Sequence, residues 1–108
     1  VQIAKKEEIR KGKATIRCFL DGEVKEYDVE ILEIDKTPNE INKGITLKVT
    51  DSELLEKTGG IVQGMSGSPI LQDGKLVGAV THVFVNNSTK GYGIFAETML
   101  KEAEKCNM

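Results

Sequence analysis

The sequence has 108 residues, with 15 Lys and Arg against 17 Asp and Glu, which gives a formal net charge of −2. A hydrophobic fraction of 39% is too high for a disordered chain, and the length suits one domain or one lobe of a larger domain. The balanced charge and an aromatic fraction of 5% argue against a nucleic-acid binder, and one His with two Cys supplies too few ligands for a zinc module.

The ends of the chain show neither a signal peptide nor a transmembrane segment, because no apolar run is long enough for either. The first residue is Val1 rather than Met, so we interpret the start as a cut. Cys18 and Cys106 are expected to be free thiols, and neither a metal nor a cofactor is expected.

The first half of the chain has the period-two alternation of β-strands over residues 14–20, 27–34 and 45–49. Asp21-Gly22 is a strong hairpin signal between the first two strands. The alternation slips at Leu32, which predicts a bulge. Thr50 and Glu53 have the spacing of a capping box, so one or two turns of helix are expected over residues 51–57.

The second half predicts strands over residues 69–71 and 76–85, joined by the turn Gln72-Asp73-Gly74-Lys75. Asn86-Asn87-Ser88 is predicted to be another turn, followed by a short strand over 91–95. Residues 96–105 have the composition of a terminal helix. The expected fold is mainly β: a small barrel lobe of about six short strands with a C-terminal helix.

The segment Gln63-Gly64-Met65-Ser66-Gly67-Ser68-Pro69 places two serines among glycines just before a strand. A hydroxyl nucleophile needs exposure and nearby backbone N–H groups, and glycines let the chain turn tightly enough to provide both. A phosphate loop is excluded because no Lys-Ser or Lys-Thr follows the glycines. The nucleophile elbow of α/β-hydrolases is excluded because Ser68 occupies the place of its second glycine, which leaves a plain Gly/Ser turn as the alternative.

The pattern Gly-x-Ser-Gly-x-Pro, followed by an apolar hairpin, resembles the nucleophile region of chymotrypsin-like serine peptidases. The longer run over residues 58–70, with 78–85 and Gly91-Tyr92-Gly93-Ile94, is similar to the SpoIVB-type signalling peptidases of spore-forming bacteria. The similarity extends from about Gly12 to Leu100. It implies that residues 1–108 are the C-terminal lobe of a chymotrypsin-like peptidase domain whose N-terminal lobe, PDZ domain and membrane anchor lie outside this chain.

The resemblance also implies roles for individual residues. Ser66 takes the position of the nucleophile, and the backbone N–H groups of Gly64 and Ser66 form the oxyanion hole. Asp51, fifteen residues before the serine, takes the position of the acid; the alternative is that Asp51 only caps the short helix that follows it. The family's histidine lies in an upstream Gly-His-Gly motif, and residues 1–50 contain no histidine.

By the same resemblance, the strand after the serine is expected to run beside bound substrate. His82 is interpreted as a residue that lines a subsite or packs in the barrel rather than as the base. Thr81 is expected to face the active site and Gln63 to lie at the rim of the primary pocket. The backbone from Val80 to Val83 is expected to pair with an extended peptide. The resemblance to digestive peptidases places Gly60 near the base of the primary pocket, where no carboxylate indicates a basic cleavage-site preference. It also implies that Met65 stands where those peptidases have the acidic residue of their zymogen switch, so that switch is not expected.

The function implied by the resemblance is cleavage of a regulatory membrane protein, after secretion from the forespore into the intermembrane space, which triggers processing of a sigma factor. Without the upstream histidine the isolated chain is expected to be nearly inert. The partners expected are a protein or peptide substrate and the missing N-terminal lobe. The alternative is a non-catalytic module that binds a peptide along Val80–Val83 or forms a homodimer through the face that the missing lobe should cover.

Overall fold

The computed structural model describes residues 2–20, 22–35, 43–59, 67–84 and 87–106. The strands are β1 (Gln2–Ile3), β2 (Gly12–Leu20), β3 (Glu23–Ile34), β4 (Ile45–Val49), β5 (Pro69–Gln72), β6 (Lys75–Phe84) and β7 (Asn87–Phe95). The helices are the 3-10 helix η1 (Lys6–Glu8), α1 (Ser52–Thr58) and α2 (Ala96–Cys106).

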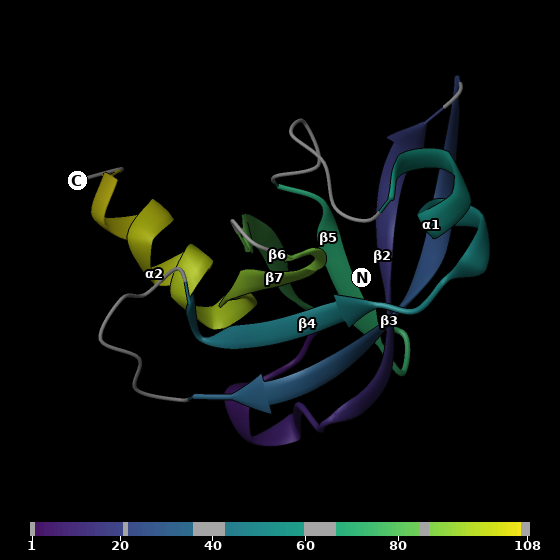
Figure 1. Cartoon of the computed structure of the whole chain (residues 1–108). Coiled ribbons are helices and arrows are strands. Elements are labelled where there is room, and N and C mark those ends of the chain that lie inside the picture. The colour runs from purple at the N-terminus through teal and green to yellow at the C-terminus, as the bar shows by residue number, and fades with distance from the viewer. Residues whose placement is uncertain (1, 21, 36–42, 60–66, 85–86, 107–108) are drawn as a thin grey trace.

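Strands β2 to β7 form a closed antiparallel barrel. The strand order is β6-β5-β2-β3-β4-β7, and β7 pairs back onto β6, while the two-residue β1 adds to β6 in parallel. The helix α1 lies beside the β2–β3 hairpin and α2 lies on the opposite side of the barrel (Figure 1). The predicted barrel lobe with a C-terminal helix is therefore confirmed.

The core is filled by the alternate residues that the period-two pattern predicted. Ile16, Val29 and Leu47, from three adjacent strands, are each at most 1% exposed. The pairing of β3 with β4 shifts register between Ile31 and Glu33, which confirms the bulge predicted at Leu32. The bulge bends β3, as closure of a small barrel requires.

Two glycines allow β6 and β7 to approach closely where the barrel closes. A Cβ atom on Gly78 would lie 1.9 Å from the Ile94 carbonyl oxygen, and one on Gly93 would lie 2.9 Å from the Ala79 carbonyl oxygen. Both neighbours are backbone atoms, which cannot rotate away as a side chain could. Closure of the barrel therefore requires glycine at Gly78 and favours it strongly at Gly93.

Residues 2–10, for which the sequence predicted no structure, form an N-terminal strap across the barrel. Ala4 and Ile9 are buried in the core. The Lys6 N–H donates to Glu97 Oε1 over 2.8 Å, and Arg10 pairs with Asp73 at 2.9 Å. The strap thus bonds to the start of α2 through Lys6 and to the β5–β6 turn through Arg10.

The predicted turn at Asn86-Asn87-Ser88 was partly wrong. Asn87 and Ser88 belong to β7, where Asn87 is opposite Phe84 of β6, and Asn86 lies outside the described residues. Strand pairing to β6 extends β7 beyond the segment that its own sequence suggested. By contrast, the turn before β6 is confirmed, with Asp73 at φ 53° and Gly74 at φ 76°.

Replacing Gly78 tests the closure. Gly78→Ala should lower the free energy of unfolding by about 3 kcal/mol or more, because the new methyl group meets backbone that cannot move aside. The matched control is Gly74→Ala, which meets no atom within 4 Å but must adopt a positive φ, at a cost of about 1 kcal/mol. Urea denaturation measures both, and equal losses would contradict the steric account.

The strap makes a pH-dependent contribution to the free energy of unfolding. The backbone N–H of Lys5, and then the Lys75 ammonium 2.5 Å away, hold the pKa of Glu8 below its ordinary value of 4.5. A carboxyl whose pKa is lower in the folded state stabilises the fold above its unfolded pKa and loses that contribution as the pH falls through the folded pKa.

Glu8→Gln should therefore be less stable than the parent protein near neutral pH, and the difference should vanish in acid. Lys75→Gln should reduce the same pH dependence. Thermal denaturation across an acid-to-neutral series measures both effects, and a Glu8→Gln difference that is constant with pH would show that the interaction is not ionic.

Candidate active site

The glycine-serine loop is joined to the barrel directly after its central serine. Gln63, Gly64 and Ser66 lie outside the described residues, as do Gly60 and Met65, and the description resumes at Gly67. The Gly67 N–H donates to the Val80 carbonyl over 2.6 Å, and the Val80 N–H donates to the Ser68 carbonyl over 2.9 Å. The residues that follow Ser66 are thus paired to the middle of β6.

These two hydrogen bonds correct one expectation. Val80 was predicted to offer its backbone to a bound peptide, but both its N–H and its carbonyl are already used by the loop. Pairing with β5 ends at Ala79, whereas pairing with β7 continues to Phe84. Among the described residues, the stretch Thr81–Phe84 therefore has a strand on one side only, and we call its other side the open edge of β6.

Thr81, His82 and Val83, the predicted substrate-binding residues, all lie along this open edge. The Thr81 hydroxyl donates to the Tyr92 carbonyl over 3.2 Å, at a register shift between Val80 and His82. The His82 side chain is exposed, and the backbone of Val83 is opposite Gly91. The structure brings the three residues together on one strand, and their contact with substrate stays a prediction.

Asp51 is held by three backbone N–H groups. Its Oδ1 accepts from Glu53 at 3.0 Å and from Leu54 at 3.2 Å, and its Oδ2 accepts from Asp28 of β3 at 3.0 Å. Asp51 is the N-cap of α1, so the predicted cap role is confirmed, while the capping box that began at Thr50 was wrong by one residue. The role of Asp51 as catalytic acid stays a prediction.

A pair of aromatic rings in contact, which the sequence did not single out, lies beside the open edge. The ring centroids of Phe84 and Tyr92 are 4.7 Å apart. The two rings border a hollow of about 300 Å³ whose lining residues are Leu32, Glu33, Thr46, Phe84, Lys90 and Tyr92. Only the pairing of β6 with β7 brings the two rings together, because they are eight positions apart in the sequence.

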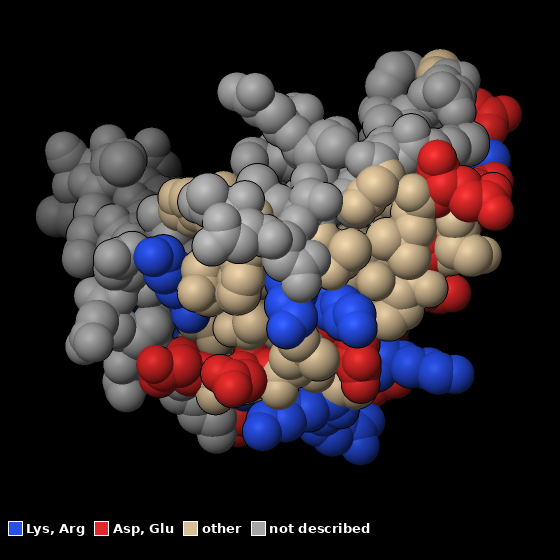
Figure 2. Space-filling model, viewed as in Figure 1, with Lys and Arg blue, Asp and Glu red and all other residues tan. Residues whose placement is uncertain are grey.

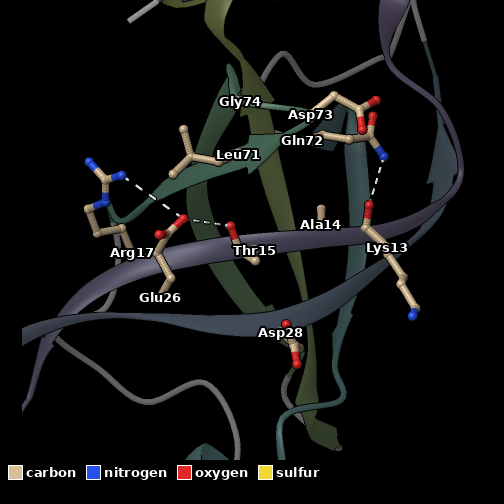
Figure 3. Close-up of a pocket in the computed structure, with 10 residues that line it drawn as sticks. All are labelled: Lys13, Ala14, Thr15, Arg17, Glu26, Asp28, Leu71, Gln72, Asp73 and Gly74. Carbon is tan, nitrogen blue, oxygen red and sulfur yellow. Dashed lines mark hydrogen bonds and ion pairs between the residues drawn. The ribbon is translucent and has the colours of Figure 1, made fainter.

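A second hollow, of about 570 Å³, lies on the outer face of β2, β3 and β5 (Figure 3). One ion pair joins two of its charged side chains: Glu26 lies 4.0 Å from Arg17 and also accepts a hydrogen bond from the Thr15 hydroxyl. The Gln72 amide donates to the Lys13 carbonyl. The hollow contains none of the predicted catalytic residues and concentrates no charge of one sign.

The surface charge is mixed in the same way on the face shown in Figure 2, where acidic and basic side chains lie next to each other. Within the described ranges, no group of three His, Cys, Asp or Glu side chains could hold a metal ion, and no helix has the length and hydropathy to cross a bilayer. Cys18 is a free thiol, as predicted, and burial raises its pKa. The Cys106 side chain lies outside the described part.

The closed barrel, its terminal helix and a serine loop paired to β6 are the architecture of one lobe of a chymotrypsin-like serine peptidase. The fold is similar to the crystal structure of the active form of Rv3671c protease from M. tuberculosis, with a TM-score of 0.64 and 15% identity over 93% of this chain and 45% of that one. It is equally similar to the inactive form of a serine-to-alanine mutant of that protein, with a TM-score of 0.65 and 14% identity over 96% of this chain and 52% of that one.

The sequence itself matches the family described as SpoIVB peptidase S55 over residues 1–100, and the chain belongs to that family. No curated protein matches it. The chain spans about half the length of the two solved structures. Family and fold thus agree with the resemblance found in the serine loop.

The cap at Asp51 can be tested apart from any catalytic role. Asp51→Ala should lower the free energy of unfolding by about 1–2 kcal/mol, because it removes an N-cap and leaves the Asp28 N–H without its acceptor. Ser52→Ala, an exposed change at the next position, is the control and should cost little. Urea denaturation of both proteins checks this, and equal stabilities would rule out the cap as a stabilising contact.

Proposed function

We propose that this chain is the C-terminal lobe of a serine endopeptidase in which Ser66 is the nucleophile. The observation that carries the proposal is the pair of hydrogen bonds joining Gly67 and Ser68 to Val80. They tie the chain directly after Ser66 to Val80, the residue directly before the open edge of β6. A peptide that pairs with that edge would have its backbone next to the serine loop.

In the proposed reaction, Ser66 Oγ attacks a peptide carbonyl carbon while a histidine outside this chain accepts the hydroxyl proton. The backbone N–H groups of Gly64 and Ser66 stabilise the resulting oxyanion, each donor being worth about 2.7–4 kcal/mol in the transition state. The histidine then gives the proton to the leaving amine, and water releases the acyl group from Ser66.

Substrate binding is assigned to the open edge, with side-chain contacts from Gln63, Thr81, His82 and Val83. The hydrogen bond from Thr81 to Tyr92 fixes the strand at the point where pairing with the loop ends. Main-chain pairing supplies affinity for any extended peptide, and the neighbouring side chains supply selectivity.

Asp51 is proposed as the acid that orients the histidine. Two of its three described hydrogen bonds fall on Oδ1 and one on Oδ2, so Oδ2 keeps a lone pair for a further donor. The cap would then also fix the carboxylate in place, as a triad acid requires.

The family name supports a role in sporulation. We propose that the whole protein is secreted from the forespore into the intermembrane space and cleaves a regulatory membrane protein, which triggers processing of a sigma factor. Its partners would be that substrate and the N-terminal lobe that supplies the histidine. A non-catalytic peptide-binding or homodimeric module is the second candidate, and the open edge of β6 favours it over other binding functions.

The test is labelling by a fluorophosphonate of the protein extended upstream far enough to include the Gly-His-Gly motif that the resemblance implies. The extended parent protein should be labelled, and Ser66→Ala should not, because the probe reacts with an activated serine. Asp51→Asn, which keeps an N-cap residue, should slow labelling at least about 100-fold if the carboxylate orients the histidine.

Each outcome has a consequence. Absence of labelling in the extended parent protein would reject the peptidase and favour the binding module. Labelling of Asp51→Asn at the parent rate would leave Asp51 as a cap only. Ser68→Ala is the control, since a serine two positions away should not be needed for labelling.

A further inference from the structure

Two aromatic residues, Phe84 and Tyr92, are only partly buried in this chain. The sequence has only five aromatic residues, three Phe and two Tyr. Tyr27 and Phe95 are buried in the core at 1% exposure. Phe84 and Tyr92, by contrast, are only partly buried and border a surface hollow. Aromatic rings held together at a surface hollow are typical of a contact site for another apolar group.

The position of these rings relates them to the open edge. Tyr92 is directly opposite His82 in the pairing of β6 with β7, so the two side chains lie on the same face of the sheet. Phe84 follows His82 by two residues and its ring contacts that of Tyr92, which places it on this face as well. A strand added at the open edge would be the next neighbour of Phe84, and long or aromatic side chains also reach diagonal neighbours.

The charges beside the two rings indicate which side chain would pack on Phe84. The Lys43 ammonium lies 5.2 Å from the centroid of the Tyr92 ring. The charged residues that line the hollow are Lys90 and Glu33. A basic side chain packed on Phe84 would approach a ring pair that already carries one cation. A large uncharged side chain would pack on the Phe84 ring, which has the Tyr92 ring behind it.

We propose that Phe84, with Tyr92 behind it, forms a subsite that selects a bulky apolar side chain of the extended peptide bound at the open edge. The inference rests on the proposed function, because it takes the open edge as the substrate-binding edge. It adds a specificity that the serine loop does not supply, and it acts through binding, so it can be measured without turnover.

The test uses acetylated, amidated heptapeptides of sequence Thr-Ser-Thr-Xaa-Thr-Ser-Thr, with Phe, Ser or Lys at the central position. They are titrated into the 108-residue chain labelled with ¹⁵N, and amide shifts are followed by NMR. The Phe peptide should shift the amides of Thr81–Phe84 and bind about fivefold more tightly than the Ser peptide, and the Lys peptide should bind less tightly than the Phe peptide.

Phe84→Ala should remove the preference by weakening the Phe peptide about fivefold without changing the Ser peptide. The matched control is Val24→Ala, which shortens a side chain that is 62% exposed on the β2–β3 hairpin and should keep the preference. Equal affinities for the Phe and Ser peptides, equal weakening of both by Phe84→Ala, or no binding of any peptide would each overturn the subsite.

The result is separable from the test of the peptidase. Labelling of Ser66 without a Phe preference would reject the subsite alone. A Phe preference that depends on Phe84, in a protein whose Ser66 is never labelled, would support the subsite as part of a peptide-binding module and reject the peptidase.

Discussion

The double pairing of β6 determines the rest of this structure. Its first half pairs with β5 and its second half with β7, and this exchange of partners closes the barrel. Closure requires the two backbones to approach at Gly78, where no side chain would fit. Pairing of β6 with β5 stops at Ala79, whereas pairing with β7 continues to Phe84. Beyond Val80, β6 therefore has one edge without a described partner strand, and this edge begins directly after the residue to which the serine loop is hydrogen-bonded.

The two hydrogen bonds at Val80 fix the position of the serine loop relative to the open edge of β6. Gly67 and Ser68 use both backbone groups of Val80, so the serine loop is hydrogen-bonded to β6 directly before the Thr81–Phe84 stretch. An enzyme that cleaves extended peptides needs this relation, because the backbone bound at the edge must present its carbonyl to the nucleophile. Fold, loop and edge therefore support the same kind of chemistry, and the family to which the chain belongs is a peptidase family.

Local patterns predicted the strands and turns well because each depends on neighbours in sequence. The alternation through Ile16 and Leu47, the slip at Leu32 and the turn at Gly74 all appear in the fold as expected. The errors came from contacts between distant segments. The strap depends on Glu97 and Asp73, and the start of β7 at Asn87 depends on β6, so neither could be read from its own stretch of chain.

The sequence predicted some residues of the candidate site and gave no signal for others. The motif around Ser66 indicated a nucleophile through its resemblance to chymotrypsin-like serine peptidases, because its residues alone also fitted a plain Gly/Ser turn. Asp51 fitted two roles that its spacing could not separate. Its contacts with Glu53 and Leu54 show the cap, which any helix-starting aspartate could form. Phe84 and Tyr92 carry no motif, and their relation exists only once β6 and β7 pair.

The central claim is that the serine loop and the open edge of β6 form one substrate site. Hydrogen exchange of the Thr81–Phe84 amides, measured on the upstream-extended protein before and after Ser66 is modified by a peptidyl phosphonate, tests it most directly. The account predicts slower exchange along this stretch when the peptide is attached, with no change in the amides of the β2–β3 hairpin. Unchanged exchange from Thr81 to Phe84 in the fully modified protein would contradict it.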